Sequence, residues 1–169
     1  MLAHLALERG LNAEAAKWLE EMTRLDLESD DAYVSLDTTS IRVRLAIARA
    51  DGSGRLNGIP QISPSSYPRV GQPHTYTLAL HAAISLARGS HLTDADLSRF
   101  EEAHLRSRRC IAQAFGTYVL FVAMRRSGRS DRAQELVNAY HETYRRETWA
   151  ASELFAQLRL QLGDLGSGS

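Results

Sequence analysis

The sequence predicts an all-α protein. Apolar residues recur at intervals of three and four along most of the chain, which is the spacing of an amphipathic helix. No segment shows the strict alternation typical of a half-buried strand. All four prolines fall within residues 51–73, so the segments on either side lack this helix breaker. The 169 residues, 44% apolar and 24% charged, are enough to build a globular core.

The first two expected helices meet at Gly10. Leu2, Leu5 and Ala6 form a short apolar stripe that stops there, and glycine readily adopts the left-handed conformation that ends a helix. Asn12 is a suitable N-cap for the next helix. One face of that helix carries Ala15, Ala16, Leu19, Met22 and Thr23.

A third helix is expected after residues 29–31, where serine and aspartate can cap its first turn. It carries two apolar stripes, one of Val34, Ile41, Leu45 and Ala48 and one of Tyr33, Leu36, Val43 and Ile47. Two stripes predict packing neighbours on both sides of this helix.

Residues 51–73, DGSGRLNGIPQISPSSYPRVGQP, are different in kind. They hold all four prolines and four of the eleven glycines, so no helix is expected to persist here. A loop of this length is usually functional or disordered. Apolar residues are nevertheless spaced through it: Leu56, Ile59, Ile62, Tyr67 and Val70. We therefore expect an extended and partly packed insert.

Residues 75–90 predict a fourth helix that ends at Gly89. Thr93 then opens a fifth helix, because Thr93 and Asp96 form a capping box in which Asp replaces the usual Glu.

Residues 110–126 predict a sixth helix that is apolar on nearly all sides and therefore central. Gly116 lowers its helix propensity, which indicates that a neighbouring helix comes close at this point. The seventh helix places Ala133, Leu136, Val137, Tyr140 and Tyr144 at helical spacing, and the eighth, from near Ala151, carries Leu154, Phe155, Leu158 and Leu162. We expect the eighth helix to cover the open end of the fold.

Two segments repeat one steric pattern. A turn glycine is followed five residues later by alanine and four residues after that by a larger apolar residue. The first set is Gly10, Ala15 and Leu19, and the second is Gly128, Ala133 and Val137. The pattern resembles a tetratricopeptide repeat. That resemblance implies antiparallel helical hairpins stacked in a right-handed solenoid, with about eight helices interrupted by the Pro/Gly-rich insert.

A narrower resemblance involves residues 6–36 and 126–162. They are similar to the opening and closing parts of the bacterial transcriptional activator domain, a tetratricopeptide-like module found behind a winged-helix domain in antibiotic-regulatory-type regulators. The resemblance implies a regulatory or oligomerising role alongside DNA-binding or nucleotide-binding domains.

These expectations give a single helical-repeat domain over residues 1–165. It comprises N-terminal helices in residues 1–50, the insert at 51–73 and C-terminal helices in residues 74–165, followed by a flexible Gly/Ser tail at 166–169.

Charge is distributed unevenly although the whole chain is formally neutral. Residues 1–37 hold three basic and nine acidic side chains, a net charge of −6. Residues 99–132 hold eight arginines and three acidic side chains, a net charge of +5. The two sections could pair between copies or serve two partners. They could equally be two solvated helix faces.

The cellular setting is inferred from cysteine and hydropathy. Cys110 is the only cysteine, which excludes an intrachain disulfide and a Cys-rich zinc site and fits a reducing cytoplasm. No apolar run has the length needed to cross a bilayer, and the N-terminus does not resemble a signal peptide. We expect a cytoplasmic location and no membrane contact.

We find no catalytic, metal-binding or cofactor-binding motif in the sequence. The six histidines lack metal-ligand spacing: Arg145, not a second histidine, stands four residues after His141. Arg55 occupies a ligand position in the calcium-loop-like Asp51 turn. There is no phosphate-binding loop, dinucleotide fingerprint or nucleophile elbow. We expect no metal, cofactor or catalytic residue, and thus no enzyme.

A binding groove is the remaining functional candidate. If the hairpins stack, the first helix of each lines a concave side, and six residues are expected to face it: Arg42, Arg49, Tyr76, Tyr118, Arg125 and Arg126. Arginine and tyrosine suit an acidic or carboxylate-bearing peptide. Alternatively, the arginines near residue 126 only cap their own helix through its dipole.

The sequence thus predicts a scaffold that binds protein or peptide and could self-associate, as the regulatory or sensor part of a bacterial transcriptional regulator or signalling protein. The main alternative is a nucleic-acid-contacting helical domain that uses residues 99–132, although that section lacks a recognition helix. A small helical enzyme is a third class, for which no convergent polar groups can be assembled.

Overall fold

The computed structural model describes residues 2–26, 32–49, 72–107 and 113–143. These residues form only α-helices, which confirms the all-α prediction for this part of the chain. The helices are α1 (Leu2–Glu8), α2 (Asn12–Asp26), α3 (Ala32–Arg49), α4 (Gln72–Ala87), α5 (Asp94–Arg106), α6 (Gln113–Arg126) and α7 (Ser130–Thr143). Residues 51–71 of the insert and the expected eighth helix lie outside the described residues.

The boundary of the insert differs from the prediction. Helix α4 begins at Gln72, so Pro73 lies in its first turn. Proline is tolerated there because the first amides of a helix have no intrahelical acceptor. The insert therefore ends before residue 72, not at residue 73.

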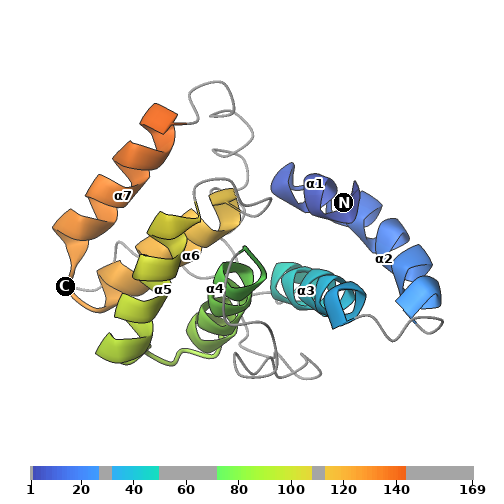
Figure 1. The fold of residues 1–169 in the computed structure, drawn as a ribbon, viewed down its shortest axis with the longest axis horizontal. Coiled ribbons are helices and arrows are strands. Elements are labelled where there is room, and N and C mark those ends of the chain that lie inside the picture. The colour runs from blue at the N-terminus through green and yellow to red at the C-terminus, as the bar shows by residue number, and fades with distance from the viewer. Residues whose placement is uncertain (1, 27–31, 50–71, 108–112, 144–169) are drawn as a thin grey trace.

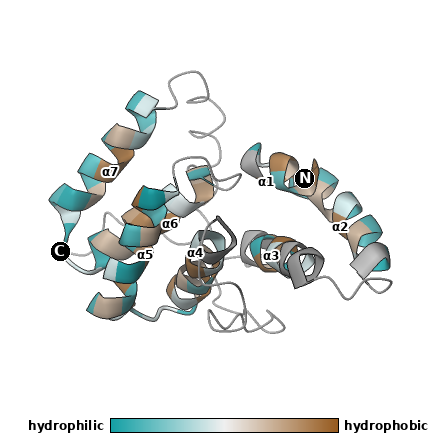
Figure 2. Cartoon of the chain, viewed as in Figure 1, coloured by the Kyte–Doolittle hydropathy of each residue, from teal (hydrophilic) through white to brown (hydrophobic). Residues whose placement is uncertain are grey.

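The helices are arranged largely in chain order. Each helix packs on the next, and α1 also contacts α3 while α4 contacts α6. Figure 1 shows α1 and α2 at one end of the long axis and α7 at the other, with α3, α4 and α6 between them. Apolar and polar residues alternate along α7, as expected for an outer helix with one buried face (Figure 2).

Helix α3 separates two hydrophobic cores. Ile41 and Leu45 pack with α1 and α2 in a small core that also contains Ala3, Ala6, Leu7 and Ala15. Val43 faces the other way, into a larger core built mainly from α4 and α6. The prediction that this helix has neighbours on both sides is confirmed.

Three glycines end helices in the same way. Gly10, Gly89 and Gly128 have φ angles of 71°, 73° and 75°, in the left-handed region that glycine adopts without strain. In each case the amide of the following residue donates to a carbonyl five residues back: Leu11 to Ala6 (2.8 Å), Ser90 to Ser85 (2.9 Å) and Arg129 to Met124 (2.9 Å). The predicted equivalence of Gly10 and Gly128 is confirmed at the level of backbone geometry.

Small residues allow close packing at the predicted positions. Ala15 and Ala133, each five residues after a turn glycine, are fully buried. A methyl group added at Gly116 of α6 would lie 3.1 Å from two ring atoms of His104 in α5. The close approach expected at Gly116 is therefore present, and α5 is the helix that makes it.

Two further predictions concern the residue that caps α5 and the presence of a membrane-spanning helix. The Thr93 hydroxyl accepts a hydrogen bond from the Asp96 amide at 3.1 Å, which confirms the capping residue. Among the described residues, the helices are too short or too polar to cross a membrane.

Candidate functional site

The two tyrosines of the predicted groove lie in the core. Tyr76 and Tyr118 are only 7% and 3% exposed. The Tyr76 hydroxyl lies 3.3 Å from Nδ1 of His4, and its ring packs edge-on against Phe115. The prediction that these tyrosines line an open groove is wrong, because α4 and α6 are central helices with no free concave side at these positions.

Three of the four arginines of the predicted groove have contacts on different helices. Arg42 is exposed on α3 and donates to the Thr23 hydroxyl of α2 at 3.1 Å. Arg126 donates to the Leu86 carbonyl at 2.9 Å and so satisfies a carbonyl at the C-terminal end of α4. Arg125 is exposed, with its guanidinium 5.9 Å from the Phe121 ring centre. The side chain of Arg49 lies outside the described residues.

Arginines of the basic section 99–132 form ion pairs. Arg106 bonds Glu102 at 2.6 Å, and Arg129 bonds Asp94 at 2.7 Å. Arg132 bonds both Glu135 and Glu101 at 2.8 Å, and these two hydrogen bonds raise its pKa. Three of the eight arginines in this section are thus paired with acidic side chains of α5 and α7.

A cavity of about 550 Å³ lies between α5, α6 and α7. The described residues that line it are His104, Leu105, Gln113, Thr117, Leu136, Ala139, Tyr140 and Thr143. None of these side chains is charged at neutral pH, because burial lowers the pKa of His104 to about 4.

One end of this cavity is a neutral polar cluster. Nε2 of His104 lies 3.0 Å from the Thr117 hydroxyl and 3.1 Å from Nε2 of Gln113. The Oε1 atom of Gln113 is buried without a hydrogen-bond partner. Rotating the amide by 180° would exchange the two atoms and leave the nitrogen unpaired instead. A buried water is the simplest group that would satisfy it.

The chemistry available in the cavity is limited. A general acid or base needs a pKa near the working pH, and that of His104 is well below it. No group of three or more His, Cys, Asp or Glu side chains that could hold a metal ion occurs within the described residues. The cluster can donate and accept neutral hydrogen bonds.

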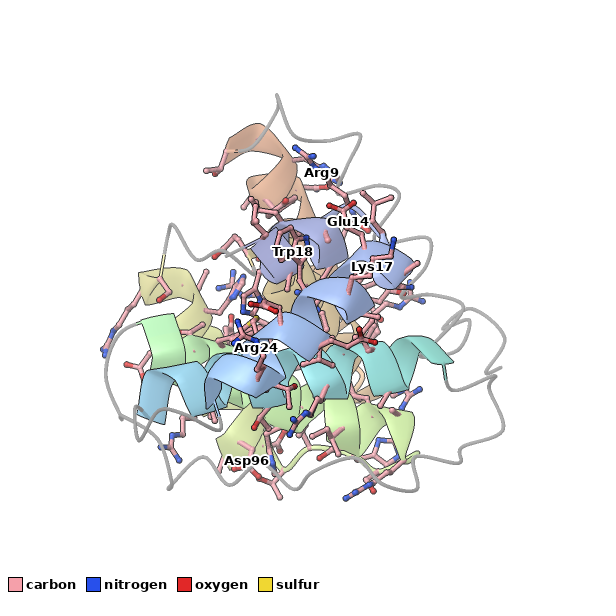
Figure 3. The ribbon with its side chains drawn as sticks, turned by 90° about the vertical axis from the view of Figure 1, so that its right-hand side faces the viewer. Arg9, Glu14, Lys17, Trp18, Arg24 and Asp96 are labelled. Atoms are coloured by element: carbon pink, nitrogen blue, oxygen red, sulfur yellow. The ribbon has the colours of Figure 1, made fainter. Side chains whose placement is uncertain are left out.

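Four of the five exposed large apolar side chains among the described residues belong to the first hairpin, and the fifth, Leu105, lies on α5. Leu2 and Leu5 of α1 are 52% and 44% exposed, and Leu11 and Trp18, two helical turns apart at the start of α2, are 45% and 37% exposed. We call these four residues the α1–α2 end face. Figure 3 looks onto this end of the molecule and shows Trp18 on α2 alongside Glu14 and Lys17.

The α1–α2 end face is the candidate functional site, and sequence reasoning missed it. The apolar stripe of the first helix predicts that Leu2 and Leu5 pack with Ala6, yet only Ala6 is buried. The spacing of Leu11 and Trp18 is the signal that could have found the face. Periodicity identifies an apolar stripe but not whether the chain itself covers it.

Comparisons with known proteins return no match: no family model matches the chain, and no curated protein or solved structure is significantly similar to it.

Proposed function

We propose that the chain is a tetratricopeptide-like helical module whose function is to bind another protein or peptide chain, which includes self-association. The observation that carries the proposal is the α1–α2 end face: four exposed large apolar side chains on the hairpin that lies at one end of the molecule. Clustered apolar exposure is costly in water and typically marks an interaction site.

The repeat architecture supports this role. Left-handed glycine turns and packing of successive helices support a solenoid of hairpins, in which the terminal unit exposes an apolar face unless something covers it. The right-handed solenoid with about eight helices is part of the proposal. The proposed role in bacterial regulation or signalling has a narrower basis. It rests on the resemblance of residues 6–36 and 126–162 to the bacterial transcriptional activator domain.

The nucleic-acid alternative is less well supported. Phosphate binding needs arginines that are free to replace counterions. Arg106, Arg129 and Arg132 are instead paired with carboxylates of their own chain.

Photo-crosslinking in cells that produce the protein tests the proposal. A photoreactive phenylalanine is placed at position 5 or 18 of the end face, and at position 95, which is exposed on α5, as the matched control. We expect positions 5 and 18 to yield an adduct with the same polypeptide and position 95 to yield none. The double variant L2E/L11E should lower the adduct yield about ten-fold, because it introduces charge into an apolar contact. Equal labelling from position 95, or none from 5 and 18, would refute the proposal.

A further inference from the structure

The first and last described hairpins share one geometry, with an offset of 118 residues between Gly10 and Gly128. In both, three residues link the two helices: 9–11 between α1 and α2, and 127–129 between α6 and α7. The φ angles of the two glycines differ by 4°. Residues at the same distance from each glycine can therefore be compared directly.

In the last hairpin, three residues in the first half of α7 or just before it approach α5 through their side chains. Arg129 bonds Asp94, and Arg132 bonds Glu101. Leu136 shares the cavity wall with residues of α5. These contacts define the stripe of α7 that faces the preceding hairpin.

Helix α6 faces α5 through the stripe that begins at Gly116, the position of closest approach to His104. Leu120 and Ala123 lie one and two turns further along the same side of the helix, and both are buried. Together these positions form the side of the last hairpin that lies toward α5.

The equivalent positions in the first hairpin are exposed. Leu120 and Ala123 correspond to Leu2 and Leu5, and Arg129, Arg132 and Leu136 correspond to Leu11, Glu14 and Trp18. Four of these five are the α1–α2 end face, and the fifth, Glu14, is also exposed. The first hairpin thus leaves exposed the positions equivalent to those that lie toward α5 in the last hairpin.

We infer that the α1–α2 end face binds an amphipathic helix of a partner chain, placed as α5 is placed on the last hairpin, with a basic side chain opposite Glu14. This inference rests on the proposed function and specifies its partner. Four large apolar side chains require an apolar stripe on the incoming helix.

The charge of Glu14 is the reason to expect a basic residue opposite it on the partner helix. In the last hairpin, Arg132 meets the acidic Glu101 of α5. The equivalent residue in the first hairpin, Glu14, has the opposite sign and forms no ion pair with a described residue. Glu21, one helical repeat along the same side of α2, is already paired with Arg24. Glu14 is therefore the carboxylate on this side of α2 that has no ion-pair partner among the described residues.

A charge-swap titration tests the inference. The probe is a peptide of residues 92–107, held helical by a hydrocarbon staple joining positions 95 and 99, both exposed on α5. One version carries Glu101→Arg and the matched control keeps the natural residue. Binding is followed by the fluorescence of Trp18 in the full chain with Trp149→Phe, which leaves Trp18 as its single tryptophan.

The E101R peptide should bind roughly five-fold tighter than its control, since an attractive contact with Glu14 replaces a repulsive one. Glu14→Arg in the protein should reverse this preference, and added salt should reduce it in both cases. Circular dichroism of the E14R protein confirms that its helix content is unchanged.

Three results would overturn the inference. If both peptides bind equally, or the preference does not reverse, a helix in the α5 register is excluded while the crosslinking result still supports a partner at this face. If neither peptide binds, the α1–α2 end face does not bind an amphipathic helix of this chemistry. If sedimentation equilibrium shows a dimer that W18E dissociates, the occupant is a second copy of this chain.

Discussion

His104 is the residue at which packing and protonation are most closely linked. Its ring fills the space that Gly116 leaves and bonds Thr117, and burial lowers its pKa from 6.5 to about 4. A protonated ring could not accept a hydrogen bond at Nε2 and would carry charge into a site with no described carboxylate. The contact between α5 and α6 therefore depends on the neutral form.

This pKa predicts a loss of stability in acid. As pH falls through 6.5 the unfolded chain binds a proton at this position, whereas the folded chain does not until about pH 4. The stabilisation is thus present above pH 6.5 and is lost as pH falls, by about 3 kcal/mol in the free energy of unfolding. Urea titrations at a series of pH values measure this slope.

His104→Gln is the control, because it retains a polar side chain but cannot titrate. The acidic groups of the two proteins are the same, so the difference between their pH slopes isolates His104. Parallel slopes for the two proteins would contradict the assigned burial.

At the residue scale, the sequence predicts some contacts and not others. A glycine in an apolar helix indicates close approach, and Gly116 shows it. The contacting residue, His104, belongs to another helix, and no spacing rule relates the two. Trp18 is an exposed apolar residue, and its apolar character alone did not predict that exposure. Burial depends on which helices are neighbours, which is not a local property.

At the scale of elements, the glycine turns were the most predictable feature. Gly10, Gly89 and Gly128 end their helices because the required φ angle excludes most other residues. Which side of each helix points into the core was less predictable from the sequence. Helices α4 and α6 are apolar on most sides, so their periodicity could not show that Tyr76 and Tyr118 point into the core.

The turns allow a test of backbone strain alone. A methyl group added at Gly128 would meet no atom within 4 Å, so Gly128→Ala changes only the conformational preference. We expect a loss of about 1 kcal/mol in the free energy of unfolding, with a smaller loss for Gly128→Asn, which tolerates the left-handed region better. Gly89→Ala, in an equally open turn, should cost a similar amount. A variant as stable as the wild type would show that the turn relaxes to another conformation.

At the scale of the whole molecule, two unequal cores share helix α3. The core beneath α1 and α2 contains several alanines, whereas the core around α4 and α6 contains Phe100, Phe115 and Met124. One polar link between them is the contact of His4 with Tyr76, whose ring packs edge-on against Phe115. Among the described residues, fewer and smaller apolar side chains are buried at the α1–α2 end, so we expect less free energy to hold it closed.

The unequal cores predict that the α1–α2 hairpin opens before the rest of the protein unfolds. Amide hydrogens in residues 2–26 should exchange faster than those of α4 and α6, because opening of this end leaves the larger core intact. Leu7→Ala, in the small core, should speed exchange in the hairpin and leave α6 unaffected. Leu80→Ala, in the large core, should lower protection throughout. If both variants change all helices equally, the molecule unfolds as one cooperative unit.

A helix bound to the α1–α2 end face adds apolar contacts only to the hairpin. It should therefore slow exchange in residues 2–26 more than in α6, and so locate the partner independently of fluorescence.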